Sequence, residues 1–130
     1  MICLDTDFVI DFLKEKHAAI EKLKACEGQE IVSTEITYAE VLLGVFLRKE
    51  VSQKELQIAQ SFFSSIRTLP LEHDAAFYAA EIASSLVKRG MEINFNDSLI
   101  GGICKTNNCA ILTRNIRHFS RIKGLKVEGY

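Results

Sequence analysis

Five short apolar segments, separated by stretches with helical spacing, constrain the fold of this chain most strongly. The apolar segments cover residues 2–4, 31–33, 68–69, 109–112 and 125–127. Parallel strands need a long crossover connection, usually a helix, whereas antiparallel strands can be joined by tight turns. Short apolar strands alternating with helices therefore predict a mostly parallel sheet with helices on both faces.

The helical stretches can be bounded by their apolar spacing and their capping residues. A short polar side chain at the N-cap accepts a backbone N–H of the first turn. By this criterion the expected N-caps are Asp7, Thr37, Ser52 and Asn96. The expected helices cover residues 7–26 (continuous or restarting within that range), 37–48, 52–66, 73–88, 96–105 and 115–119.

The composition favours one domain over residues 1–130. Apolar residues make up 48% of the chain and charged residues 25%, which is typical of globular proteins. No apolar run approaches the roughly 20 residues that cross a bilayer, and Asp5 stands where a secretion signal needs a basic segment. We therefore expect a cytoplasmic protein. The four cysteines form no CxxC pair, so we expect buried thiols rather than disulfides or a zinc site.

Charge is distributed unevenly along the sequence. Residues 1–104 carry 10 basic and 16 acidic side chains, whereas residues 105–126 carry six basic side chains and no acid. A basic segment on an acidic body is compatible with a phosphate-bearing partner, although many basic segments are only solvated surface.

Three acids are expected near the carboxyl ends of the strands, where open α/β sheets place their sites. Asp5 closes the first strand, and a carboxylate there is unfavourable unless it is paired or binds a cation. Each acid also has an ordinary structural explanation. Asp5 could accept backbone N–H groups, and Glu40 fits a T-x-x-E capping box with Thr37. Asp97 suits the positive end of a helix.

Gathered in one crevice, the same three carboxylates predict a metal site. Like charges at close range repel, so such a cluster is stable only if it is protonated or neutralised by a cation. Oxygen ligands favour Mg²⁺ or Mn²⁺, and such an ion can polarise a phosphodiester and generate a hydroxide nucleophile. These residues therefore indicate hydrolysis of a phosphate ester.

Four segments carry these acids in a characteristic setting. They are LDTDFVIDFL at 4–13, ITYAEVLLG at 36–44, INFNDSLIGGIC at 93–104 and ILTRNIRHFSRIKGLKV at 111–127. In order and spacing they resemble the PIN-domain family and, within it, the VapC-type toxins of prokaryotic toxin–antitoxin pairs. The resemblance covers essentially the whole chain. It implies a three-layer α/β/α PIN-like fold with four to five strands and a metal-dependent endoribonuclease.

Under this resemblance, Asp5, Glu40 and Asp97 match the acids with which the family binds one or two Mg²⁺ or Mn²⁺ ions. Thr6 and Thr113 are expected to orient those ligands by hydrogen bonding.

The last segment departs from the family pattern. Many members have a fourth polar or acidic group there, whereas this chain offers Asn115, a neutral ligand that holds a second ion more weakly. Asp7 is an extra acid that we attribute to helix capping. His118 is expected to pack or to cap rather than to transfer protons.

The resemblance also implies RNA as the substrate and a VapB-like antitoxin as a partner. Four cations are expected at the rim of the crevice as contacts for RNA phosphates: Arg114, Arg117, Arg121 and Lys123. Five apolar residues exceed what one face of a small domain buries: Leu42, Leu43, Phe46, Phe62 and Phe63. We expect those left exposed to form a homodimer interface and a groove for an antitoxin helix or strand.

Two other functions remain open from the sequence. A PIN-like module that binds RNA or protein without cleaving it would tolerate the missing fourth acid. A phosphatase of the haloacid dehalogenase type is suggested by LDTD at 4–7, which imitates its D-x-D motif. That second interpretation leaves Glu40 and the TRN segment unexplained.

Overall fold

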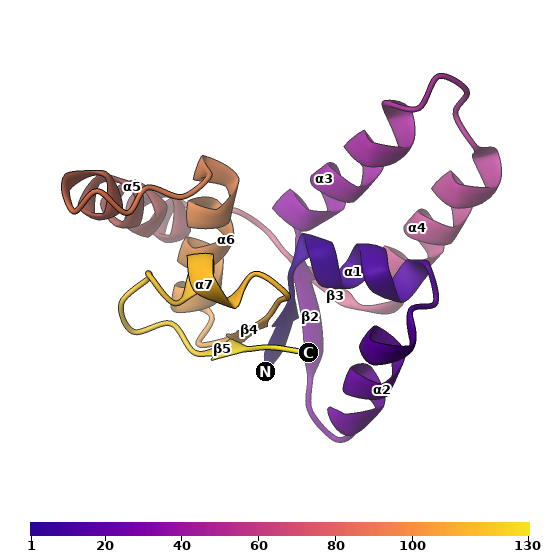
Figure 1. Ribbon diagram of the computed structural model, residues 1–130, viewed down its shortest axis with the longest axis horizontal. Helices are drawn as coiled ribbons and strands as arrows, with labels where there is room; N and C mark the ends of the chain where they lie inside the picture. Colours follow the sequence, from indigo (N-terminus) through magenta and orange to yellow (C-terminus); the bar gives the residue numbers. More distant parts are fainter.

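The computed structural model describes residues 1–130 and places five strands in one parallel sheet (Figure 1). The strands are β1 (Ile2–Leu4), β2 (Ile31–Thr34), β3 (Arg67–Leu69), β4 (Ala110–Leu112) and β5 (Val127–Glu128). They lie in the order β3-β2-β1-β4-β5, and every neighbouring pair is parallel. The expected α/β/α fold with a central parallel sheet is confirmed.

Seven helices surround the sheet. They are α1 (Thr6–Leu13), α2 (His17–Ala25), α3 (Glu35–Phe46), α4 (Gln53–Ser65), α5 (His73–Lys88), α6 (Phe95–Thr106) and α7 (Ile116–Phe119). The helical stretch at 7–26 restarts because Glu15, with φ of 58°, turns the chain in the left-handed region. None of the helices combines the length and hydrophobicity that a membrane span requires.

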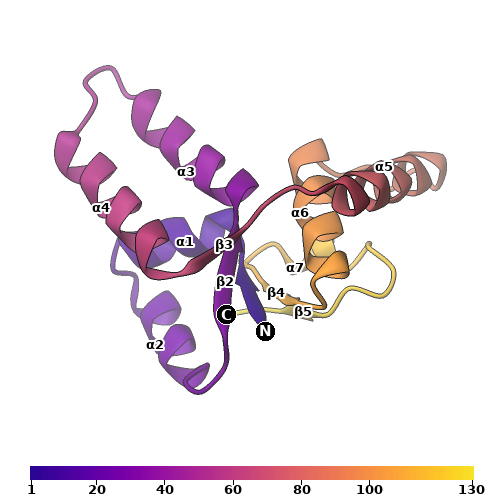
Figure 2. The same cartoon turned by 180° about the vertical axis from the view of Figure 1, so that it is seen from behind.

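Each face of the sheet has its own hydrophobic core, because successive strand residues point to opposite faces. Ile2 and Leu4 of β1 pack with residues from α1 to α4, whereas Cys3 packs with residues from α5, α6 and α7. The two groups of helices lie on opposite sides of the sheet in both views (Figures 1 and 2). All four cysteines are free and buried, as expected.

Three helices begin earlier than the sequence pattern indicated. Their N-caps are Asp5, Thr34 and Asn94, where Asp7, Thr37 and Asn96 were expected. Ser52 caps α4 as expected, accepting the N–H of Glu55 at 3.2 Å. The expected caps are wrong because the chain leaves the extended conformation two or three residues sooner in each case. As a result, the side chains of Asp7 and Glu40 do not cap helices, whereas Asp97 lies in the first turn of α6 as expected.

The strand order places the acids at a topological switch point. From β1 the chain builds β2 and β3 on one side, then crosses to add β4 and β5 on the other side. The connections therefore diverge beyond the carboxyl ends of β1 and β4, where α/β sheets place their ligands. Asp5 follows β1 and Thr113 follows β4 at this edge.

Helices α5 and α6, which flank this edge, pack so closely that Gly102 has no room for a side chain. A Cβ there would overlap the carbonyl oxygen of Ala75 and lie 3.0 Å from the backbone nitrogen of Ala79.

Replacing Gly102 with alanine is therefore expected to lower the free energy of unfolding by about 1–3 kcal/mol, since two backbones would have to separate. Urea denaturation measures this. The matched control is Gly44→Ala in α3, where a Cβ meets nothing within 4 Å and a gain of about 0.5–1 kcal/mol is expected. Equal effects of the two substitutions would contradict this prediction.

Candidate active site

Asp5 is the most deeply placed acid of the site. It is the N-cap of α1 and only 5% exposed. The Thr113 hydroxyl donates to its Oδ2 at 2.8 Å. Burial, and then the negative charge of Asp7, raise the pKa of Asp5 to about 8, despite the opposing effect of the Thr113 hydrogen bond. A buried carboxyl group with so high a pKa favours either a proton or a nearby cation.

Glu40 lies in the second turn of α3 and reaches toward α1 and α6. The Thr6 hydroxyl donates to its Oε1 at 2.7 Å, and the Asn96 side-chain amide lies 3.5 Å from Oε2. The capping box expected between Thr37 and Glu40 is wrong, because Thr34 already accepts the Thr37 N–H at 3.0 Å. Glu40 is thereby left free to face the other acids.

Asp97 enters from the first turn of α6. Its Oδ2 lies 3.8 Å from Nδ1 of His118. Burial and the charge of Glu40 raise the pKa of Asp97 to about 6, the charge of Asp7 adds to this, and His118 opposes it. Asp97 is thus electrostatically coupled to acids carried by two other helices.

Asp7 also belongs to this acidic cluster, although the sequence pattern indicated only a capping role for it. Its carboxylate oxygens lie 3.3 and 3.4 Å from the Thr113 hydroxyl that donates to Asp5, and Oδ1 accepts the backbone N–H of Arg114 at 3.3 Å. Helix α1 therefore brings two carboxylates to one hydroxyl group. The i, i+2 spacing of Asp5 and Asp7 was visible in the sequence, but the expected capping role concealed it.

Asn115 and His118 border the cluster on the side of α7. The Asn115 side-chain nitrogen lies 2.8 Å from Nδ1 of His118, and the Asn115 backbone N–H donates to the Thr113 hydroxyl at 2.9 Å. His118 is partly exposed and faces Asp97, so its side chain lies at the site and not only in packing contacts.

The donor chemistry of this cluster fits a hard divalent cation, although the side chains do not form a closed binding shell. The donors are carboxylate and amide oxygens, which suit Mg²⁺ or Mn²⁺. No three acidic, histidine or cysteine side chains converge closely enough to enclose an ion as they stand. Burial, and after it the charges of neighbouring carboxylates, raise the pKa values of Asp5 and Asp97, which favours a proton or a cation at this cluster.

The four expected rim cations lie in different surroundings. The Arg114 guanidinium pairs with Asp11 at 3.0 Å. Arg117 is exposed. Arg121 donates to the backbone carbonyls of Met91 and Glu92, and Lys123 lines a pocket beside α5. The four side chains therefore do not form one cluster around the acids.

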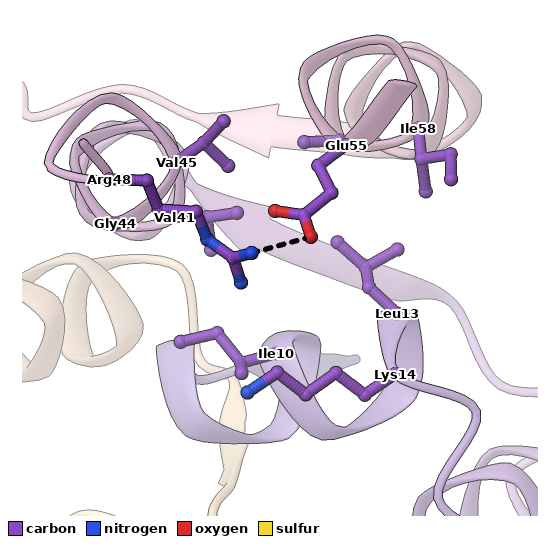
Figure 3. Close-up of a pocket in the computed structure, with 10 residues that line it drawn as sticks. Ile10, Leu13, Lys14, Val41, Gly44, Val45, Arg48, Glu55 and Ile58 are labelled. Carbon is purple, nitrogen blue, oxygen red and sulfur yellow. Dashed lines mark ion pairs between the residues drawn. The ribbon is translucent and has the colours of Figure 1, made fainter. Parts of the chain in front are cut away.

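A separate pocket lies between α1, α3 and α4 (Figure 3). Its volume is about 230 Å³, and its walls are mostly apolar, with Ile10, Val41 and Ile58 among them. An ion pair between Arg48 and Glu55, at 2.9 Å, closes one side. The pocket is an apolar groove with a polar edge on the face opposite α5.

The fold and this arrangement of acids define a PIN domain, and the family's sequence profile matches residues 2–125. The chain belongs to the PIN-domain family. This discards the phosphatase alternative.

Individual relatives narrow the comparison to VapC proteins. The chain is 27% identical to the tRNA(fMet)-specific endonuclease VapC of Shigella flexneri over 98% of this chain and 96% of the relative. It is 31% identical to Ribonuclease VapC2 of Rickettsia felis over 80% of this chain and 77% of the relative.

Solved structures agree with this. The structure of VapBC2 from Rickettsia felis, bound to a promoter DNA fragment, aligns with a TM-score of 0.90 at 26% identity, covering 100% of this chain and 99% of that chain. FitAcB from Neisseria gonorrhoeae aligns with a TM-score of 0.81 at 25% identity, covering 98% and 96%.

Proposed function

We propose that this protein is a metal-dependent endoribonuclease that acts as the toxin of a type II toxin–antitoxin pair. The observation that carries the proposal is the electrostatic coupling of Asp5, Glu40 and Asp97 at the switch point of a PIN fold. Three helices bring these acids together, and the raised pKa values of Asp5 and Asp97 indicate an environment that a cation would stabilise. The ribonuclease names of the relatives support the same activity.

Asp5, Glu40 and Asp97 would hold one or two Mg²⁺ or Mn²⁺ ions. Such an ion, when bound, supplies polarisation of the phosphodiester and activation of water. The hydroxyl groups of Thr113 and Thr6 would fix the orientation of Asp5 and Glu40, since each already donates to the carboxylate concerned. Groups that orient metal ligands in this way commonly affect metal affinity 10- to 100-fold.

Cleavage of RNA by the purified chain, free of antitoxin, tests the proposal. Initiator tRNA is the first substrate to try, because it is named for the Shigella relative. We expect cleavage with Mg²⁺ or Mn²⁺, none with a chelator, and none with Glu40→Gln. Cleavage that persists with chelator would refute the metal mechanism. Binding of RNA without any cleavage would instead favour the non-catalytic PIN-like module.

Asp7 is proposed as the fourth metal-associated acid of this chain, in the role that an acid of the last segment has in many relatives. We expect Asp7→Asn to weaken Mn²⁺ affinity by about 10- to 100-fold, and Asn115→Ala to weaken it less, because a neutral amide contributes less to binding. Isothermal titration with Mn²⁺ measures both. If Asn115→Ala weakened Mn²⁺ affinity more than Asp7→Asn, the fourth metal-associated group would be Asn115 and not Asp7.

A VapB-like antitoxin is the proposed partner, in keeping with the VapBC complexes among the structural neighbours. The apolar groove between α1, α3 and α4 (Figure 3) suits a helix or strand of that partner. We propose that the antitoxin inhibits by placing a basic side chain, such as arginine, among the acids.

The proposed oligomer is a homodimer in the cytoplasm. Of the five apolar residues singled out in the sequence, Phe63 is buried, and Leu42 and Phe62 pack partly against the core. Leu43 and Phe46 remain 56% and 54% exposed on α3, and they are the proposed contacts. Light scattering that shows a monomer at high concentration would refute the dimer.

A further inference from the structure

A basic groove lies between α5, α6 and the turn at residues 121–124, separate from the acidic cluster. Its volume is about 440 Å³. The charged residues that line it are four cations, Arg89, Lys105, Arg121 and Lys123, and a single acid, Glu81. The groove therefore concentrates positive charge in a chain whose net charge is −1.

These four cations are not neutralised by the protein. None of them forms an ion pair with a carboxylate, although six other Lys and Arg side chains do. Arg121 is held by the carbonyls of Met91 and Glu92, and Arg89 donates to the Arg121 carbonyl. The guanidinium groups are thus positioned by neutral acceptors, which leaves their charge available to an anion.

The turn contributes backbone donors as well. The N–H groups of Lys123 and Gly124 donate to no backbone acceptor, and Gly124 has a positive φ of 82°. Successive free N–H groups next to a left-handed residue form a concavity that favours anions. Both residues line the groove, so unpaired backbone donors lie at the same groove as the four cations.

The groove and the acids lie at different points along α6. Asp97 is in its first turn, and Lys105 is next to its last residue. Eight residues at 1.5 Å per residue separate them by about 12 Å along the helix axis. For Lys105 this corresponds to about four nucleotides at the 3.4 Å rise of one strand in a duplex. Arg121, which binds the carbonyls of Met91 and Glu92, lies nearer the start of α6.

We propose that this groove binds the phosphate backbone of the RNA substrate, several nucleotides from the bond that is cleaved. The inference rests on the proposed ribonuclease function and adds the path of the RNA strand over the protein surface. Three of the lining cations, Arg89, Lys105 and Lys123, are exposed, and Arg121 is half-buried. Such a surface suits a continuous polyanion whose phosphates are contacted without recognition of the bases.

The test measures RNA binding by the full chain in the presence of chelator, so that no cleavage occurs. We compare the wild type with Lys105→Gln/Lys123→Gln, using initiator tRNA at about 50 to 200 mM salt. The variant is expected to bind about tenfold more weakly at the low-salt end. Its slope of log affinity against log salt should fall by about 1 for each lysine removed.

The matched control is Lys49→Gln/Lys54→Gln. It removes the same charge from exposed, unpaired lysines at the α3–α4 turn, on the opposite side of the molecule (Figure 1). An unchanged salt slope in the groove variant, or an equal loss of RNA affinity in the control, would refute RNA binding by the groove. Neither result would contradict the proposed ribonuclease function. Absence of RNA binding and cleavage by the wild type would overturn both.

Discussion

Asp5→Asn is expected to reduce RNA cleavage more than about 100-fold and, in metal-free protein at pH 8, to increase stability. The loss of activity follows from removal of a charged metal ligand, since even residues that only orient such ligands change activity 10- to 100-fold. The gain in stability follows because burial and the charge of Asp7 raise the pKa of Asp5 to about 8. Asparagine fills a similar volume and carries no charge.

The sign of this pH dependence can be tested directly. Folded Asp5 keeps its proton up to about pH 8, whereas the unfolded chain releases it near pH 4. The metal-free wild type should therefore lose stability as the pH rises from about 4 to 8, by on the order of a few kcal/mol, and Asp5→Asn should remove that part of the slope.

Thermal unfolding with and without Mn²⁺ separates the loss of metal binding in Asp5→Asn from its gain in metal-free stability. Ligand that binds only the folded state raises the melting temperature, so Mn²⁺ should stabilise the wild type at pH 8 but not Asp5→Asn. Glu27→Gln, which removes an exposed and unpaired acid, is the control and should behave as the wild type does. A metal-induced shift that survives Asp5→Asn would show that Asp5 is not a ligand.

Asp11→Ala is expected to lower the free energy of unfolding by about 3 kcal/mol. Asp11 is buried, accepts the Tyr130 hydroxyl at 2.6 Å, and pairs with Lys16 at 3.1 Å and Arg114 at 3.0 Å. Burial alone would raise its pKa, but the hydrogen bonds and the two cations outweigh burial and lower it. One carboxylate thus joins α1 to the C-terminal residue and to the Thr113–Asn115 segment.

The partners of Asp11 provide graded controls. Arg114 and Lys16 are largely exposed, so Arg114→Ala should cost less than about 1 kcal/mol, and Tyr130→Phe about 1 kcal/mol for one hydrogen bond. The stability that depends on Asp11 should be lost as the pH falls through its lowered pKa, because the unfolded chain takes up the proton first. Urea denaturation would contradict this network if Arg114→Ala cost as much as Asp11→Ala.

The strands could be predicted closely because their signal is local. Every expected apolar segment became a strand with bounds within two residues, and Ser52 capped its helix as expected. The caps of α1, α3 and α6 could not be located as well. Asp5, Thr34 and Asn94 each compete with an equally good capping residue two or three positions later, and only the end of the preceding extended segment selects between them.

The type of chemistry at the site could be predicted from the sequence, but the full set of residues that form the site could not. Asp5, Glu40 and Asp97 could be named because Asp5 closes a strand, Glu40 and Asp97 lie near the starts of helices, and the sites of such folds lie at that edge. Asp7 could not, since a carboxylate in a first helical turn has a sufficient local explanation. Its place beside Thr113, a residue 106 positions away, depends on β1 pairing with β4.

The sequence by itself therefore determined the α/β/α layers of this protein and the acidic chemistry of its site. Both follow from apolar periodicity and residue type, which are properties of short segments. Tertiary structure decided which polar groups meet. The shared contact of Asp5 and Asp7 with Thr113, the hydrogen bond between Tyr130 and Asp11, and the position of Lys105 and Lys123 in one groove each depend on strand order and helix packing. Contacts between distant residues arise only when non-local pairing closes the chain, and no local pattern encodes them.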